Sequence, residues 1–215
     1  MFKRLTALLV PVAAALVLVP AAFAAGGHYT FVGGSAFERS QVMQALSVSS
    51  FPWNIIPGTV VVHIKPLDVS EATPGAVWLD AGLLDAGVFS WGVIQHEFGH
   101  QVDFALLNPA MRLQLAAQLG GGSWWGDFAH EHGDFGSERF ASELSWAYWP
   151  SAENCLRPVG QQDEAGHLAP ALFRAALAAL LPQAAVAPTY GNLPQLAPPL
   201  ARKPASKALR RALTR

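Results

Sequence analysis

The stretch IQHEFGHQVDF, from Ile94 to Phe104, places two histidines four residues apart, with a glutamate directly after the first. Residues at this spacing lie one above the other on an α-helix, so His96 and His100 can aim ring nitrogens at one point. Neutral imidazole is a good zinc ligand, and the neighbouring Glu97 can reach an attacking water without binding the metal. The stretch therefore predicts a metal-binding helix that carries its own general base.

The surrounding sequence favours a helix at this position. The run from Ser90 to Leu107 contains no internal proline, and its apolar residues recur at helical spacing. Asn108 and Pro109 end this helix and can begin the next one, which Gly120 ends. The motif alone also fits an ordinary helix whose histidines make ordinary hydrogen bonds. A third ligand on a separate element decides between the two interpretations.

That third ligand is expected shortly after a glycine-rich loop. A catalytic zinc takes three protein ligands, and we favour Glu138, because a side chain in the first turn of a helix is held rigidly. The alternatives in and after the loop are His130, Glu131, His132 and Asp134. The metzincin pattern fits badly, since Asp103 and Leu106 occupy its glycine and last histidine positions.

The rest of the chain predicts a small sheet with helices. Ser35 and Glu38 have the spacing of a capping box, which predicts a helix to about Ser47. Short strands are predicted at 59–65, which Pro66 stops, and at 76–80. Further helices are expected at 136–149 and 169–181. We therefore expect an α+β fold with a small sheet beside the histidine helix and a helical C-terminal half.

The N-terminus indicates export. Residues 1–24 have Lys3 and Arg4 before an apolar run that ends in Ala22-Phe23-Ala24, which predicts a secretory signal peptide cleaved after Ala24. An uncleaved anchor is the alternative. No later stretch is apolar for long enough to span a bilayer. We expect a secreted or extracellular protein, in solution or held at the cell surface.

Length and charge divide the exported chain in two. We place one domain at residues 25–183 and a Pro/Ala-rich basic tail at 184–215. Residues 25–201 carry 6 Lys and Arg against 15 Asp and Glu, whereas residues 202–215 carry 6 basic residues and no acidic one. The tail is either a solvated end or a contact to anionic cell-surface polymers, and the acidic domain disfavours nucleic acid as a partner. Cys155 is the only cysteine, so no internal disulfide can form.

Several side chains near the motif are given supporting roles. Asp103 lies three residues beyond His100 and is expected either to accept an N–H from a ligand imidazole or to face solvent. Glu143 points elsewhere on its helix than Glu138 and is expected to be structural or to support the site. The pair Trp124-Trp125 is expected to pack rather than to bind substrate.

HEFGHQVD followed by ERFASE resembles the catalytic core of the anthrax-toxin lethal-factor-like zinc peptidases, which are gluzincins. The resemblance covers roughly residues 78–149 and is specific mainly at these two motifs. It implies a zincin-like fold in which Glu138 binds zinc and the strand at 76–80 is the sheet edge that pairs with an extended peptide. The family's tyrosine before its glutamate ligand is not matched. We therefore expect His130 or His132 to stabilise the oxyanion instead.

The function expected is that of a secreted, monomeric zinc metallopeptidase acting on a peptide or protein substrate. His96, His100 and Glu138 would hold Zn2+, and Glu97 would act as general base. One alternative is a non-enzymatic zinc-binding cell-surface protein, and another is a hydrolase of cell-wall peptide cross-links. Glu97 argues against the first alternative, because a structural site needs no general base and tends to be closed by four protein ligands.

Overall fold

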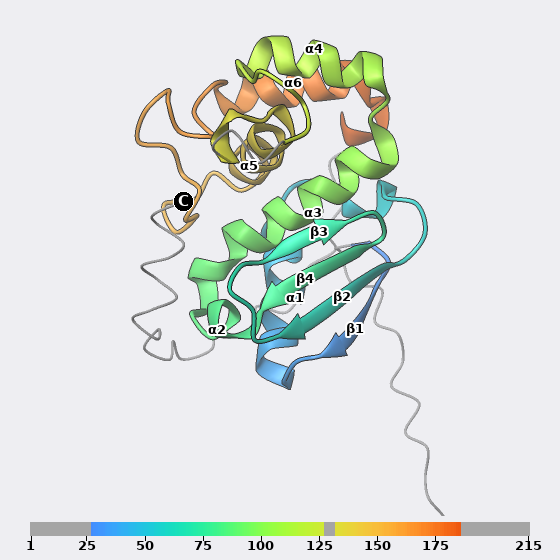
Figure 1. The fold of residues 1–215 in the computed structure, drawn as a ribbon, viewed down its shortest axis with the longest axis vertical. Helices are drawn as coiled ribbons and strands as arrows, with labels where there is room; N and C mark the ends of the chain where they lie inside the picture. The colour runs from blue at the N-terminus through green and yellow to red at the C-terminus, as the bar shows by residue number, and fades with distance from the viewer. Residues whose placement is uncertain (1–26, 127–131, 186–215) are drawn as a thin grey trace, which may run out of the picture.

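The computed structural model describes residues 27–126 and 132–185, which form a mixed α+β fold (Figure 1). This part of the chain contains a four-stranded sheet and six α-helices, as the sequence predicts in outline. The segment predicted as a signal peptide, His130, Glu131 and the tail beyond residue 185 lie outside the described residues. Within the described residues, no helix is both long and apolar enough to cross a membrane.

The sheet is mostly parallel and has one antiparallel edge. Its strands are β1 (Tyr29–Gly33), β2 (Val60–Lys65), β3 (Glu71–Thr73) and β4 (Ala76–Asp80). Their order is β1-β2-β4-β3, with β3 antiparallel to β4 and the other pairs parallel. The prediction that 76–80 is the edge is therefore wrong. The turn at Gly75, which has a φ of 80°, folds β3 back onto β4 and makes β3 the edge.

One face of the sheet carries the core. Val62, Ile64, Val77 and Leu79 are buried there, under helices α1 (Ala36–Val48) and α3 (Trp91–Leu106), which lie behind the sheet in Figure 1. Alternate residues point to the opposite face, where the ring of His63 stacks on that of Trp78 with centroids 5.0 Å apart. His63 is thus a packed side chain on the outer face of the sheet.

The structure confirms the helix boundaries that were predicted from capping residues. Ser35 and Glu38 form the capping box of α1, with distances of 3.2 Å and 2.6 Å between each side-chain oxygen and the other's backbone nitrogen. Asn108 caps α4 (Pro109–Leu119), and Gly120 ends it with a φ of 67°. The remaining helices are α2 (Ala81–Leu84), α5 (Gly136–Tyr148) and α6 (Pro170–Leu180).

Helices α3 and α5 cross in close contact through small residues. A Cβ atom added at Gly99 would lie 3.0 Å from the Cα atom of Ala141 and 3.3 Å from its Cβ atom. One turn further along α5, the Ser145 hydroxyl donates a 3.0 Å hydrogen bond to the carbonyl oxygen of Gly92. Gly99 therefore lets the backbone of α5 approach α3 without an intervening side chain.

The segment between α5 and α6 folds back against α5. The Glu143 carboxylate accepts hydrogen bonds from the backbone nitrogens of His167 (2.7 Å) and Leu168 (2.8 Å). Arg139 donates to the ring Nε2 of His167 and to the carbonyl oxygen of Gly133, each over 2.6 Å. Glu143 is thus structural, one of the two roles expected for it, and these bonds hold the segment against the first turns of α5.

Glu143 makes stability depend on pH. It is fully buried, its Oε2 atom has no hydrogen-bond partner among the described residues, and this burial raises its pKa to about 7 despite the two backbone donors. A glutamate in an unfolded chain has a pKa of about 4.3. The folded protein therefore holds this proton more tightly. The associated stability is fully present below about pH 4.3 and is lost as the pH rises through about 7.

We predict that Glu143→Gln removes this dependence, because an amide oxygen still accepts the backbone hydrogen bonds but carries no charge. Urea unfolding at pH 5 and pH 8 should show a loss of stability that is smaller in the variant than in the wild type by on the order of 3 kcal/mol. Glu153→Gln, at an exposed position, is the control and should behave as the wild type. An equal loss in Glu143→Gln would contradict the assignment.

Candidate metal centre

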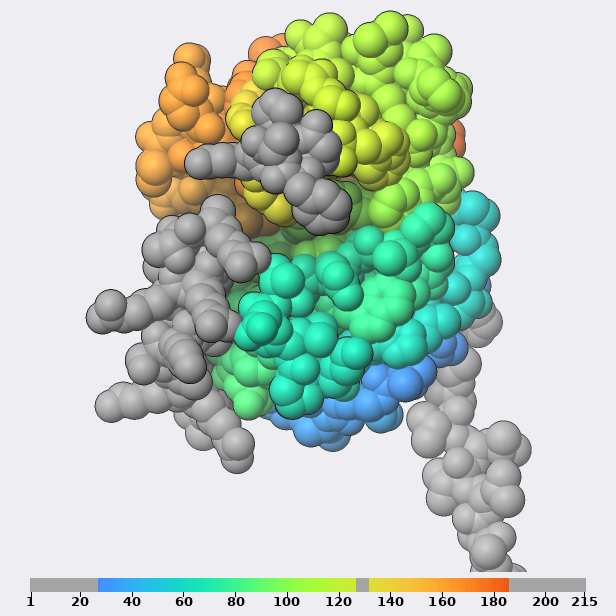
Figure 2. All heavy atoms as spheres, viewed as in Figure 1, coloured from blue at the N-terminus to red at the C-terminus, as the bar shows by residue number. Residues whose placement is uncertain are grey.

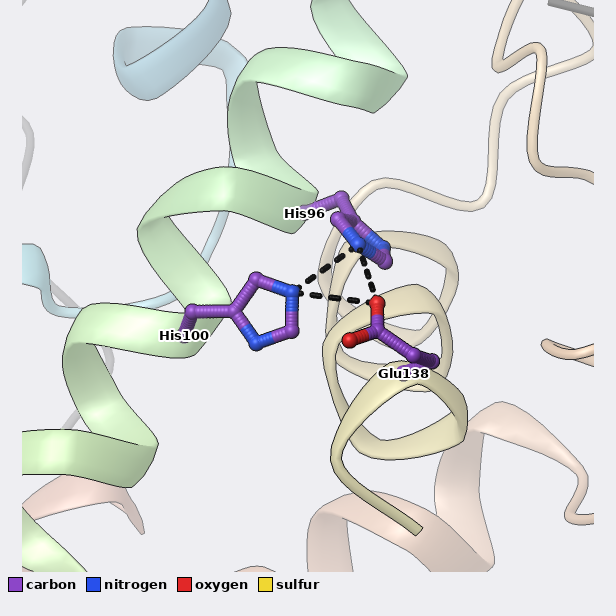
Figure 3. Close-up of side chains that lie close together, drawn as sticks. All are labelled: His96, His100 and Glu138. Carbon is purple, nitrogen blue, oxygen red and sulfur yellow. Dashed lines mark hydrogen bonds and ion pairs between the residues drawn. The ribbon is translucent and has the colours of Figure 1, made fainter. Parts of the chain in front are cut away.

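His96 and His100 on α3 face Glu138 in the first turn of α5 (Figure 3). The Nε2 atoms of the two histidines are 3.1 Å apart, and Oε2 of Glu138 lies 3.1 Å from His96 Nε2 and 3.2 Å from His100 Nε2. The three atoms form a nearly equilateral triangle. The structure thus brings together the three residues that the sequence predicts as metal ligands.

The size of this triangle fits a small metal ion. A tetrahedral site with bonds of about 2.0–2.1 Å to nitrogen and oxygen has edges of about 3.3–3.4 Å between ligand atoms. The distances of 3.1–3.2 Å in the structure are close to that value. Both histidines are only 7% exposed, and the Glu138 side chain is 18% exposed. These three residues could therefore hold a metal ion.

The electrostatics of the triangle favour a cation. Burial alone would raise the pKa of Glu138, but the hydrogen bonds from His100, His132 and His96 outweigh it and hold that pKa far below its usual range. Burial alone would lower the pKa of His96, but the hydrogen bond to Glu138 and the charge of Glu97 outweigh it and raise the pKa. Glu138 is therefore ionised, and the two glutamates favour positive charge among the converging atoms.

Glu97 lies beside the triangle without belonging to it. It follows His96 on α3 and is 5% exposed. Burial raises the pKa of its carboxyl group, and positive charge on His96 and His100 offsets part of that rise. A buried carboxylate of this kind accepts a proton more readily than an exposed one. Glu97 is therefore a buried carboxyl group with a raised pKa, next to His96 in sequence and outside the converging group.

His132 approaches the triangle from the short 3₁₀ helix η3 (His132–Asp134). Its Nε2 atom lies 3.0 Å from Oε2 of Glu138, and its Nδ1 atom lies 3.0 Å from Oε1 of Glu164. Hydrogen bonds to these two carboxylates raise the pKa of His132, whose side chain is 56% exposed. Among the described residues, His132 and Asp134 are not in the group whose ligand atoms converge.

Glu164 is a component of the centre that sequence reasoning missed. One carboxylate oxygen contacts His132, and the other accepts a 2.8 Å hydrogen bond from the Ser142 hydroxyl. The Ser142 oxygen lies 3.0 Å from Nδ1 of His96. Ser142 could have been found, because it lies one helical turn after Glu138. Glu164 carries no such signal, since it lies in an irregular segment 26 residues after Glu138.

Asp103 has neither of its two expected environments. Its carboxylate is fully buried and accepts hydrogen bonds from Arg112 Nε (2.7 Å) and Trp124 Nε1 (2.9 Å). Asp103 therefore fastens α4 and the following loop to α3, and Trp124 has the packing role expected of it. Trp125 instead is 44% exposed and stacks on Phe104, with centroids 5.5 Å apart.

Gln101 joins the centre to the edge of the sheet. Its Nε2 atom donates to the carbonyl oxygens of Thr73 (2.9 Å) and Ala76 (3.0 Å), and its Oε1 atom accepts from the backbone nitrogen of Gly75 (2.8 Å). The residue after His100 thus holds the β3–β4 turn against α3. Figure 2 shows the surface recessed between this side of the sheet and the helical half, with α3 at the base.

The arrangement defines a mixed α+β protein with a buried His-His-Glu centre that could hold a metal ion. Searches of protein-family models, curated proteins and solved structures find no match to this chain. Any functional assignment therefore depends on the chain's own residues and their geometry.

We predict that Glu138→Ala lowers metal affinity by about 100-fold or more, because it removes one corner of the triangle. Chelator competition on the metal-free protein measures the effect. Glu153→Ala, at an exposed position outside the triangle, should bind metal as the wild type does. If Glu131→Ala weakened binding and Glu138→Ala did not, the third ligand would have to be reassigned.

We also predict that Gly99→Ala weakens metal binding, because its Cβ atom would lie 3.0 Å from the backbone of α5 and force the helices apart. Overpacking costs about 1–3 kcal/mol, against a gain of about 1 kcal/mol in helix propensity. Ala105→Gly, exposed on the same helix, should lower stability by about 1 kcal/mol and leave metal affinity unchanged. Unchanged affinity in Gly99→Ala would show that the crossing does not set the triangle.

Proposed function

We propose that the chain is a zinc metallopeptidase of the lethal-factor-like gluzincin type, which hydrolyses peptide bonds. The observation that carries the proposal is the convergence of His96, His100 and Glu138 within 3.1–3.2 Å of one another, with Glu97 adjacent on α3. Two imidazoles and one carboxylate are a ligand set that suits zinc and leaves a coordination position for water or substrate. Zinc bound there would polarise a carbonyl group and acidify a water molecule.

Glu97 supplies the proton transfers in this proposal. Its carboxylate takes the proton from the attacking water and later passes it to the nitrogen of the leaving amine. The raised pKa of Glu97 supports both steps, because a carboxylate that binds its proton more strongly is a better base and, once protonated, remains a competent acid at neutral pH. Glu97 also favours an enzyme over a structural zinc protein.

His132 is the proposed donor to the carbonyl oxygen of the scissile bond. Its ring is half-exposed, and its Nε2 atom lies 3.0 Å from Oε2 of Glu138, which places the ring beside the centre. In this proposal His132 stabilises the oxyanion in place of the tyrosine that the lethal-factor-like family has before its glutamate ligand and that this chain does not match. His130, the other candidate, lies outside the described residues.

The edge strand supports a peptide as substrate. β3 pairs with β4 on one side only and is held beside α3 through Gln101, so an extended peptide that added to the sheet there would pass the metal centre. In this proposal β3, and not the strand at 76–80 that the resemblance implied, is the sheet edge that pairs with the substrate peptide. The signal-peptide prediction at 1–24 places the enzyme outside the cytoplasm, as a secreted or surface-held monomer.

The proposal predicts chelator-sensitive cleavage of a peptide library. The purified protein should contain one zinc, lose cleavage when a chelator removes it and regain cleavage when zinc is restored. Glu97→Gln should retain zinc and lose at least about 100-fold in rate, since it cannot take the proton. Glu153→Gln is the matched control.

Three outcomes would overturn or redirect the proposal. Absence of zinc from the purified protein would exclude it, and full activity in Glu97→Gln would exclude the mechanism. Cleavage of cross-linked cell-wall peptides without cleavage of linear library peptides would favour the cell-wall hydrolase.

A further inference from the structure

We infer that Glu164 is a positioning residue that orients two histidines of the centre at once: His132 directly and His96 through Ser142. Glu164 lies in the segment between α5 and α6, outside both sequence motifs. The inference rests on the proposed function in one respect, which is that the triangle binds a metal.

The hydrogen bonds run in one consistent direction. Nε2 of His96 faces the triangle, so in the neutral ring the proton is on Nδ1 and is donated to the Ser142 oxygen over 3.0 Å. The Ser142 hydroxyl in turn donates to Oε2 of Glu164 over 2.8 Å. The carboxylate thus fixes the tautomer in which Nε2 is free to bind a metal. It also makes that nitrogen more basic and so a stronger metal ligand.

The second carboxylate oxygen fixes His132. Nδ1 of His132 lies 3.0 Å from Oε1 of Glu164, which leaves Nε2 directed at Glu138. His132 is half-exposed and sits on a short 3₁₀ helix, where its ring also lies against that of His96. Glu164 thus holds one ring nitrogen while the other meets Glu138.

Glu164 is itself held in place. A Cβ atom added at Gly133 would lie 3.2 Å from its Cγ atom, so the backbone beside His132 is in contact with its side chain. The segment that carries Glu164 is fixed just beyond it, where Glu143 accepts the backbone hydrogen bonds of His167 and Leu168. A carboxylate that packs against Gly133 and is followed by a fixed stretch of backbone can keep its partners in one orientation.

His100 provides an internal contrast. Its Nδ1 atom is buried and has no hydrogen-bond partner among the described residues. Among the described residues, His96 is therefore the one helix histidine whose Nδ1 atom is linked to a carboxylate. The effect of Glu164 on metal affinity should pass through His96 alone.

The test is zinc and cobalt(II) affinity of the metal-free protein, measured by chelator competition. Glu164→Gln has one acceptor oxygen where the carboxylate has two, and it should bind both metals about 10–100-fold more weakly. Ser142→Ala should weaken the binding of both metals by a similar factor. The double variant should lose little more than either single one, because both act on the same path. The visible spectrum of bound cobalt(II) should change in both variants.

Two controls separate this path from general effects. Asp163→Asn alters the adjacent carboxylate, which accepts from the backbone nitrogens of Val159 and Gly160, and should leave affinity and spectrum unchanged. Glu153→Gln, at an exposed position outside the centre, should likewise leave affinity and spectrum unchanged.

The outcomes distinguish the inference from the proposed function. If the wild type binds metal and Glu164→Gln binds it equally well, Glu164 is not a positioning residue and the proposed function stands. If the wild type binds no metal, the proposed function fails. Should Glu164→Gln not fold, as judged by circular dichroism, Ser142→Ala carries the test, and unchanged affinity and spectrum there would overturn the inference.

Discussion

The contact between Gly99 and Ala141 sets the distance on which the metal centre depends. Two ligands from one helix are aligned by helical geometry alone, but the third comes from another helix, and its position follows from how closely the two backbones approach. Gly99 lets α3 meet the backbone of α5 without an intervening side chain. The hydrogen bond from Ser145 to Gly92 continues this close crossing on the next turn. The triangle of 3.1–3.2 Å is a product of that crossing.

Buried polar side chains connect the centre to the rest of the fold. Asp103 joins α3 to Arg112 and Trp124, and Gln101 joins α3 to the turn before β4. Glu143 ties the segment before α6 to α5. Each is buried, so a lost partner would leave a polar group unsatisfied at a cost of about 1–3 kcal/mol. Helix α3 is therefore fixed both to the sheet, through Gln101, and to the helical half, through Asp103.

Local signals in the sequence were sufficient to predict most of the helices. Glu138 was predicted as the third ligand from its position in the first turn of a helix together with the resemblance to the gluzincins. Ser35, Asn108 and Gly120 act within a few residues of themselves, so their effects can be predicted without the fold. The sheet edge was predicted wrongly because β3 has three residues, too few to show an alternating pattern. Glu164 was missed because its partners are brought to it only by the folding of a long irregular segment, and nothing in its own neighbourhood indicates them.

The placement of the ligands on two helices gives a bound cation a mechanical role. His96 and His100 belong to the helix that packs on the sheet, whereas Glu138 belongs to the helix that packs on α6. A cation shared by them would close a loop of 38 residues between His100 and Glu138 and act as a cross-link between the two halves. Exported proteins commonly obtain such a cross-link from a disulfide, which a chain with the single cysteine Cys155 cannot form within itself. Removal of a bound ion would then loosen the two halves of the molecule against each other.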